Sequence, residues 1–162
     1  MNQENVIKTI TRRLGKLSKF SWRERGLLLE SFFLLGIGRF LVIMVPFRRV
    51  APHLGEINGS HPLIFQETDQ EHVQQIARWV RFSSRFTPFT SNCFNKALAA
   101  HFMLRRRGLS STLYLGVAKE GQNMEAHAWL ISGEQIITGA DVHERFTEVS
   151  HFTWTPKETL LE

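Results

Sequence analysis

The spacing of apolar and polar positions changes along the chain from a helical period to an alternating one. Up to about residue 108, apolar residues recur every three or four positions, which predicts α-helices. After Gly108, runs rich in β-branched and aromatic residues alternate with short glycine-containing turns, which predicts strands. The pattern therefore predicts an α+β fold, with helices first and one helix packed on a small antiparallel sheet.

The first 20 residues predict a short basic helix. Within residues 5–20, four apolar residues recur at helical spacing, and Lys and Arg fill much of the remainder. This pattern is typical of a helix that contacts an acidic partner or an anionic membrane, and equally of a solvated helix on the surface of its own domain. The sequence leaves both alternatives open.

A longer apolar helix follows. Ser21 and Glu24 form a capping box at its predicted start, and Pro46 ends it. The apolar stretch is long enough to cross a bilayer, but Glu30 and Arg39 interrupt it, and each would cost about 3 kcal/mol in hydrocarbon. We therefore expect a helix buried on most sides rather than a membrane span, and no cleavage site indicates a signal peptide.

An irregular connection and a third helix are expected next. Residues 46–68 contain three prolines and two glycines, which favour an irregular segment. Thr68 and Glu71 form a second capping box ahead of an apolar stripe, which predicts a helix over residues 68–82. Pro88 then breaks the helical pattern.

The only cysteine of the chain lies at the predicted start of a fourth helix. This helix spans about residues 91–107, with Ser91 or Asn92 as N-cap and Gly108 as the stop. The first turn of a helix offers unpaired N–H groups and a partial positive charge, both of which favour a thiolate. Cys93 is therefore a candidate nucleophile, although by position alone a structural buried cysteine is the commoner case.

Residues 111–118, 124–131 and 135–138 predict three strands joined by two tight turns. Consecutive hairpins of this kind form a three-stranded antiparallel meander. The region after the meander contains no pattern that places it in the fold.

Composition narrows the classes of function. The 162 residues suffice for one domain, and a single cysteine allows neither an internal disulfide nor a zinc site built from several cysteines. The net charge is +5, and residues 1–25 alone carry +5. Because the basicity belongs to a terminal arm and not to a basic cleft, we expect no nucleic-acid binding.

His127 is the candidate base for Cys93. A cysteine nucleophile needs a group that takes its proton and returns it to the leaving amine, and imidazole suits this role near neutral pH. His127 lies mid-strand between two alanines, and the strand period places it on the same face as Trp129, which can shield the ring from water.

Asp141 is the candidate orienting carboxylate for the His127 ring. If residues 132–134 form the hairpin turn, residues 139–141 lie opposite His127 on the next strand. Glu125 and Glu144 are alternatives for the same role.

The remaining histidines are weaker candidates. His101 lies eight residues after Cys93 on the same helix, about 12 Å along its axis, and cannot serve as its base. His143 and His151 are expected at the surface, and the three upstream histidines match no spacing.

A metal site made of Cys93, His127 and His143 lacks any metal-binding spacing. No glycine-rich phosphate loop is present either. We therefore expect neither metal nor cofactor.

The order of these residues resembles a known family. A cysteine at a helix start, His-Ala-Trp on a strand and then an aspartate resemble the transglutaminase-like branch of papain-fold enzymes. More narrowly, the chain resembles the lasso-peptide maturation proteases, which are leader peptidases, over most of its length. The matching segments are residues 23–41, 46–55, 78–117 and 125–139.

This resemblance implies a bacterial, cytoplasmic cysteine peptidase that removes the leader from a ribosomally made precursor peptide. A separate ATP-dependent cyclase would then close the lasso ring. The implied roles are nucleophile for Cys93, general base for His127 and orienting residue for Asp141. The implied partners are the precursor peptide, a separate leader-binding protein acting in trans, and the cyclase.

Two other functions use the same residues. A transglutaminase-like acyltransferase would pass the acyl group to an amine, and a non-catalytic scaffold would hold precursor and maturation enzymes together. Residues 1–55 are expected to form a helical segment that packs on the core or docks a partner, with membrane contact left open. Residues 56–162 are expected to form the catalytic core.

Overall fold

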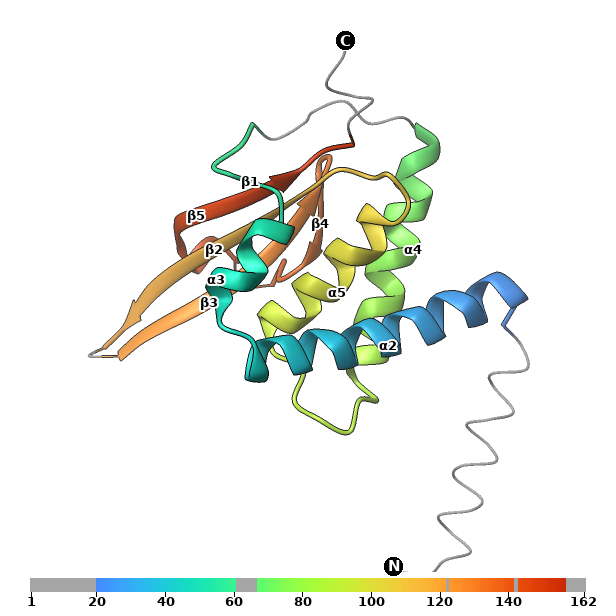
Figure 1. Ribbon diagram of the computed structural model, residues 1–162, viewed down its shortest axis with the longest axis horizontal. Coiled ribbons are helices and arrows are strands. Elements are labelled where there is room, and N and C mark those ends of the chain that lie inside the picture. The colour runs from blue at the N-terminus through green and yellow to red at the C-terminus, as the bar shows by residue number, and fades with distance from the viewer. Residues whose placement is uncertain (1–19, 61–66, 122, 142, 157–162) are drawn as a thin grey trace, which may run out of the picture.

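The computed structural model describes residues 20–60, 67–121, 123–141 and 143–156. Its elements form three tiers (Figure 1). A five-stranded antiparallel sheet is one tier, helices α4 and α5 pack on it, and helix α2 packs on those two helices. The fold class is α+β, as the sequence predicts. The expected helix over residues 5–20 lies outside the described residues.

The helices begin and end close to the expected positions. Helix α2 spans Trp22–Met44, and its capping box is formed: the Ser21 N–H donates to Glu24 Oε2 at 2.9 Å, and the Glu24 N–H donates to Ser21 Oγ at 3.3 Å. Helix α4 spans Glu67–Ser84, one residue earlier than the expected cap at Thr68, whose side chain is outside the described part. Helix α5 spans Cys93–Arg105.

The sheet contains the expected meander and two further strands. Strands β2 (Ser111–Glu120), β3 (Asn123–Ser132) and β4 (Gln135–Thr138) pair in sequence, and β5 (Thr147–Trp154) pairs with the other edge of β2. Strand β1 (Glu56–Ile57) extends the sheet beyond β5. The strand order is therefore β1-β5-β2-β3-β4, not a three-stranded meander.

The expected irregular connection over residues 46–68 also contains short elements. A one-turn helix α3 (Phe47–Val50) and a 3₁₀ turn η1 (Ala51–His53) precede strand β1. The Phe47 ring contacts Phe94 and Phe152 edge-on, each at 5.7 Å between centroids. These contacts hold α3 over the start of α5 and the end of the sheet.

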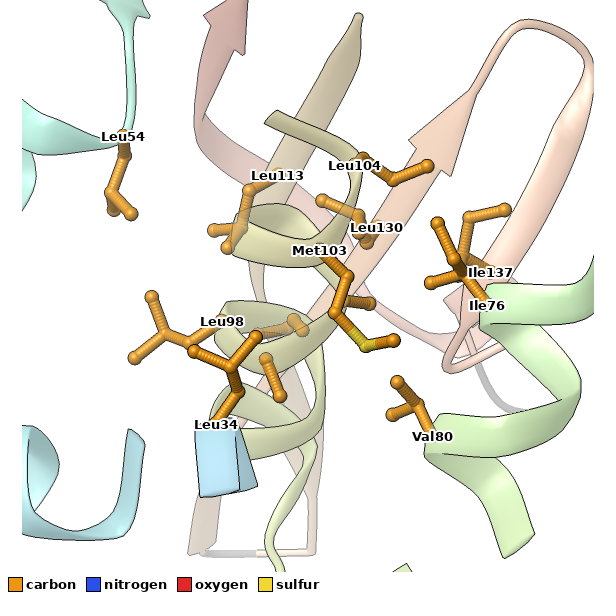
Figure 2. Packing of buried hydrophobic residues seen from close by; sticks show 14 of the residues in the cluster. Leu34, Leu54, Ile76, Val80, Leu98, Met103, Leu104, Leu113, Leu130 and Ile137 are labelled. Atoms are coloured by element: carbon orange, nitrogen blue, oxygen red, sulfur yellow. The ribbon is translucent and has the colours of Figure 1, made fainter. Parts of the chain in front are cut away.

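The core lies between the sheet and helices α4 and α5 (Figure 2). Helix α5 buries eight of its thirteen residues, more than one face of a helix holds, because it is covered on both sides. The fully buried side chains of this core include Leu98, Met103 and Leu104 from α5, Val73, Ile76 and Val80 from α4, and Leu113, Leu130 and Ile137 from the sheet.

Helix α2 is not buried on most sides, so that expectation is wrong. Leu28, Leu34 and Leu35 pack inward, but Leu29 and Phe33 on the other side are 70% and 69% exposed. The physical reason is that α2 is the outermost tier and has partners along one face only. By length and composition α2 alone, among the described helices, could cross a membrane, and 28% of its most apolar window is buried.

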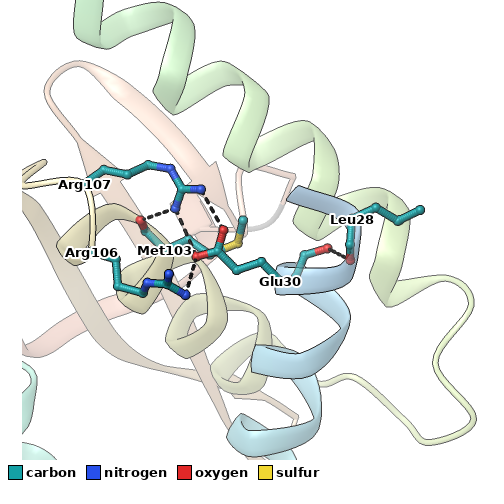
Figure 3. Close-up of polar contacts among 6 residues, drawn as sticks. Leu28, Glu30, Met103, Arg106 and Arg107 are labelled. Carbon is teal, nitrogen blue, oxygen red and sulfur yellow. Dashed lines mark hydrogen bonds and ion pairs between the residues drawn. The ribbon is translucent and has the colours of Figure 1, made fainter. Parts of the chain in front are cut away.

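Glu30 on α2 is accommodated by an ion-pair cluster (Figure 3). Its carboxylate, 12% exposed, lies 2.6 Å from Arg107 Nη2 and 3.2 Å from Arg106 Nη1. Arg107 also donates to the Met103 carbonyl at 2.8 Å. The charge that interrupts the apolar helix thus ties α2 to the C-terminal end of α5.

A buried histidine makes the stability of this fold depend on pH. His101 on α5 is fully buried, and Nδ1 lies 3.0 Å from Ser111 Oγ on β2. Burial, and secondarily the Arg105 charge, lowers the pKa of His101 to about 4. The unfolded chain therefore binds this proton more readily than the folded chain once the pH falls below about 6.5.

We predict that lowering the pH from 7 to 4 costs about 3 kcal/mol of unfolding free energy through His101 alone. His101→Gln, which cannot titrate, is expected to flatten the pH dependence by that amount in urea denaturation. His53→Gln, the same substitution at an exposed position, serves as the control. Equal slopes for wild type and His101→Gln would refute the assignment.

Candidate active site

Cys93 is the first residue of helix α5, as the sequence predicts. Asn92 is the N-cap, and its side-chain oxygen accepts the Asn95 N–H at 2.9 Å. The first N–H groups of a helix have no acceptor within it, so the start of α5 can receive developing negative charge. The Cys93 side chain is half-buried at this end.

His127 lies at the middle of strand β3 and shares a face with Trp129, as the strand period predicts. The two rings are 6.3 Å apart and nearly parallel, and the Phe146 ring stacks on His127 at 4.8 Å. The residue opposite His127 is Gly116, where an added Cβ would meet Trp129 and Phe146 at 2.7–3.0 Å. The absence of a side chain there lets both aromatic rings close around the imidazole.

Cys93 and His127 border the same cavity, of about 420 Å³. The other lining residues are Leu41, Val42, Val45, Phe47, Val50, Asn92, Phe94, Leu98, Leu115, Ala126 and Ala128. Ala128 belongs to the core on the α5 side of the sheet, and side chains alternate along a strand, so the His127 ring projects from the other face. Among the described residues no hydrogen bond joins this ring to Cys93.

Gly139 and Asp141 follow strand β4, and Gly139 lies on the Nε2 side of the His127 ring. A Cβ on Gly139 would lie 2.8 Å from His127 Nε2, and Gly139 has a φ of +80°. Nε2 is buried without a well-formed hydrogen bond to the described residues. The carboxylate of Asp141 acts on the ring electrostatically. The structure therefore brings Asp141 into the neighbourhood of His127.

The environment of His127 favours the neutral ring. Burial lowers the pKa of His127 below its ordinary value, while the Asp141 charge opposes this shift. The charge of Lys96 on α5 lowers the pKa further, and the Gly139 backbone raises it. A neutral imidazole at pH 7 can accept a proton, as a general base must.

The alternative carboxylates lie in other surroundings. The Glu125 side chain is 44% exposed and pairs with Arg145 at 3.4 Å, and a hydrogen bond to Glu120 is the main reason that the pKa of its carboxyl is raised. Glu144 is exposed on the 3₁₀ turn η2 (His143–Arg145).

His143 and His151 are held by structural contacts. His151 is not a free surface side chain, because Nδ1 contacts Glu148 at 2.5 Å and Nε2 contacts the Gly59 carbonyl at 3.0 Å. Nδ1 of His143 lies 3.1 Å from the Ala140 carbonyl. Within the described parts of the chain, no three His, Cys, Asp or Glu residues gather as metal ligands would.

A cysteine-bearing helix packed on an antiparallel sheet that carries a histidine defines an α+β fold of the transglutaminase-like class. A family model described as the Transglutaminase-like superfamily matches residues 41–151, well over half of the chain. The chain therefore belongs to the transglutaminase-like superfamily, which includes cysteine peptidases and acyltransferases. Comparison with curated proteins and with solved structures found no match.

No local sequence pattern predicts several of the residues that border the site. The wall formed by α2 and α3, Phe146 beside His127, and Lys96 near the imidazole all depend on tertiary packing. The assignment of Cys93, His127 and Asp141 as catalytic residues stays a prediction.

We predict that Gly139→Ala destabilises the fold and displaces the His127 ring, because the new methyl group would overlap Nε2. Gly121→Ala is a matched control: its φ is +62°, and a Cβ there meets nothing within 4 Å. We expect a loss of about 1 kcal/mol for the control and about 3 kcal/mol for Gly139→Ala in thermal unfolding. Equal losses, with unchanged His127 ring signals in NMR spectra, would contradict this prediction.

Proposed function

We propose that this protein is a cysteine peptidase that removes the leader from a lasso-type precursor peptide. The observation that carries the proposal is that Cys93, at the start of α5, and His127, on β3, border one apolar cavity. The order of residues that resembles the lasso leader peptidases gives the substrate class.

In this mechanism the Cys93 sulfur attacks the carbonyl carbon of the scissile peptide bond. His127 takes the thiol proton and returns it to the leaving amine, so that the core peptide departs and the leader remains as a thioester on Cys93. Water then attacks the thioester, with His127 as base, and releases the leader. The Cys93 N–H is positioned at the helix start to stabilise the oxyanion.

In the free protein the His127 ring projects from the face of β3 opposite α5, so this proton transfer requires β3 to rearrange until the ring reaches Cys93. Catalytic residues that are not in contact in the free protein can come into contact in the substrate complex. Asp141 would stabilise the imidazolium and fix its tautomer in that state.

Acyl transfer to an amine is the second candidate, because the superfamily includes acyltransferases. The first half of the reaction is identical, and an amine replaces water in the second half. A protein that only holds the precursor and its maturation enzymes is the non-enzymatic alternative.

We predict that the protein cuts the precursor peptide encoded beside its gene at one site when the cognate leader-binding protein is present. Cys93→Ala and His127→Ala are expected to lose at least about 10³-fold in rate, and Asp141→Asn to lose less. Mass spectrometry of the products is the measurement, and retention of the far-ultraviolet circular dichroism spectrum is the control for folding.

An added amine separates the two reactions. A leader fragment that ends in a free carboxylate, with the mass of water added across the cut bond, indicates hydrolysis. A leader fragment that carries the added amine as an amide indicates transfer. Full cleavage by Cys93→Ala would show that Cys93 is not the nucleophile. Wild-type activity in Asp141→Asn would show that Asp141 does not orient His127. Absence of any cleavage by wild type with the partner present would favour the scaffold.

A further inference from the structure

The cavity beside Cys93 is mostly apolar. Among the described residues, Asn92 and Cys93 line it with polar side chains, His127 borders it, and the other lining side chains are aliphatic or aromatic. No Lys, Arg, Asp or Glu in the described parts of the chain lines it. A charged group that entered this cavity would lose its hydration without meeting an opposite charge.

The apolar wall of the cavity is held rigidly in place. Five of its residues come from the end of α2, from its C-cap and from α3: Leu41, Val42, Val45, Phe47 and Val50. The Phe47 ring contacts Phe94 and Phe152 edge-on, and Val50 is buried in the core. The wall is therefore part of the packed fold and not a loop that adapts to each ligand.

We propose that this cavity is the acyl-side specificity pocket: it binds an uncharged, apolar side chain of the substrate next to the carbonyl attacked by Cys93. This inference rests on Cys93 as the nucleophile of the proposed function. A volume of about 420 Å³ is within the range of small-molecule sites and accommodates a large aliphatic or aromatic side chain.

The test uses the fact that Cys93 is the only cysteine of the chain, so the whole-protein mass reports its alkylation. Two iodoacetamides with the same reactive group are compared, one with an N-hexyl and one with an N-(5-carboxypentyl) substituent. Each rate is divided by the rate of the same reagent with N-acetylcysteine amide. We expect the hexyl reagent to be favoured by at least about tenfold, since burial of two methylene groups is worth that much.

Adjacent residues of α2 provide matched variants. Val42 lines the cavity, whereas Ile43 is 59% exposed and does not line it. Val42→Glu is expected to abolish the preference for the hexyl reagent, and Ile43→Glu to keep it. Phe47→Ser, at a partly exposed position of the wall, replaces Val42→Glu if that variant does not fold.

Equal normalised rates of the two reagents with wild type would overturn the pocket. Alkylation requires no peptide turnover, so it separates this inference from the proposed function. If the protein prefers the hexyl reagent tenfold but cleaves no precursor, the apolar pocket beside Cys93 is supported and the proposed peptidase function is refuted.

A different part of α2 supports a second inference. Its outer face carries a continuous apolar stripe, which we call the outer stripe and which consists of Trp22, Leu29, Phe33, Phe40, Ile43 and Met44. These residues are 59–84% exposed, and Gly26 and Gly36 lie in open space between them. A stripe of this size on a soluble domain indicates a surface that binds something apolar.

The charges around the outer stripe are basic. Arg23 is exposed next to Trp22 at its start, and Arg48 and Arg49 are exposed just beyond its end. The two acidic residues of α2 are already used, Glu24 in the capping box and Glu30 in its ion pairs. Apolar side chains flanked by arginines, with Trp22 at one end, match the composition of a helix that lies in an anionic membrane surface.

We propose that α2 binds an anionic lipid surface through the outer stripe and lies in its plane. The inward face of α2 is packed on α4 and α5, so the helix does not cross the bilayer without unfolding this tier. A second copy fits less well, because an antiparallel pair of α2 helices would bring Arg23 of one copy toward Arg48 and Arg49 of the other.

The test is flotation of the full chain with vesicles of equal phosphatidylglycerol and phosphatidylcholine, and with vesicles of phosphatidylcholine alone. Binding to the anionic vesicles is expected at about 0.1 M salt and should weaken at about 1 M. The double variant Phe33→Glu/Phe40→Glu is expected to lose at least about tenfold in partitioning. Met124→Glu, at an exposed apolar residue of the β2–β3 hairpin, should bind as wild type does.

No flotation of wild type with anionic vesicles would overturn the proposal. A concentration-dependent dimer in sedimentation velocity that Phe33→Glu/Phe40→Glu abolishes, without vesicle binding, would assign the stripe to a second copy instead. Equal binding of the double variant and wild type would show that the stripe is not the contact surface.

Discussion

The burial of helix α5 between two tiers is the constraint on which the site depends. Ala97, Ala99 and Ala100 have no exposed surface, and such small residues let the sheet and the outer helices approach α5 closely. Helix α2 comes close to α5 at Gly38, where a Cβ would lie 2.3 Å from Asn95 Oδ1. Because Asn95 follows Cys93 by two residues, this contact fixes the end of α2 beside the candidate nucleophile.

The two ends of α5 therefore have different roles: one borders the candidate site and the other anchors α2. At its N-terminal end, Cys93 and Phe94 line a cavity that has no charged lining residue among the described residues, and a developing oxyanion there would meet a low dielectric and little competing water. At its C-terminal end, Arg106 and Arg107 pair with Glu30 and hold the outer helix. The charged contacts that stabilise the tiers are thus kept away from the polar groups that would carry the chemistry.

Patterns among residues close in sequence predict most helices and strands of this fold. They do not predict pairing between segments that are far apart in sequence. The capping box at Ser21, the start of α5 and the β2–β4 meander all depend on residues a few positions apart. Strand β5 was not predicted, because its partner is about 40 residues away, as in the Thr112–Thr153 pair, and its outer part is polar. Within the site, the strand period predicted His127 beside Trp129, whereas Phe146 and the α2–α3 wall required the tertiary structure.

Helix α2 is less buried than its sequence predicts, because its apolar residues serve three different surfaces. A helix that is apolar all round shows no hydrophobic face in its sequence, so the expectation of burial was the natural one. In the structure three surfaces of α2 are apolar for separate reasons: the inner face packs on α4 and α5, the last turns line the Cys93 cavity, and the outer stripe faces solvent. Any one of these three apolar surfaces alone would make α2 amphipathic. The three together give α2 the apolar composition that is typical of a transmembrane helix. A substitution on α2 should therefore be judged by its surface: inner positions affect stability, Val42 affects the cavity, and Phe33 affects only what the outer stripe binds.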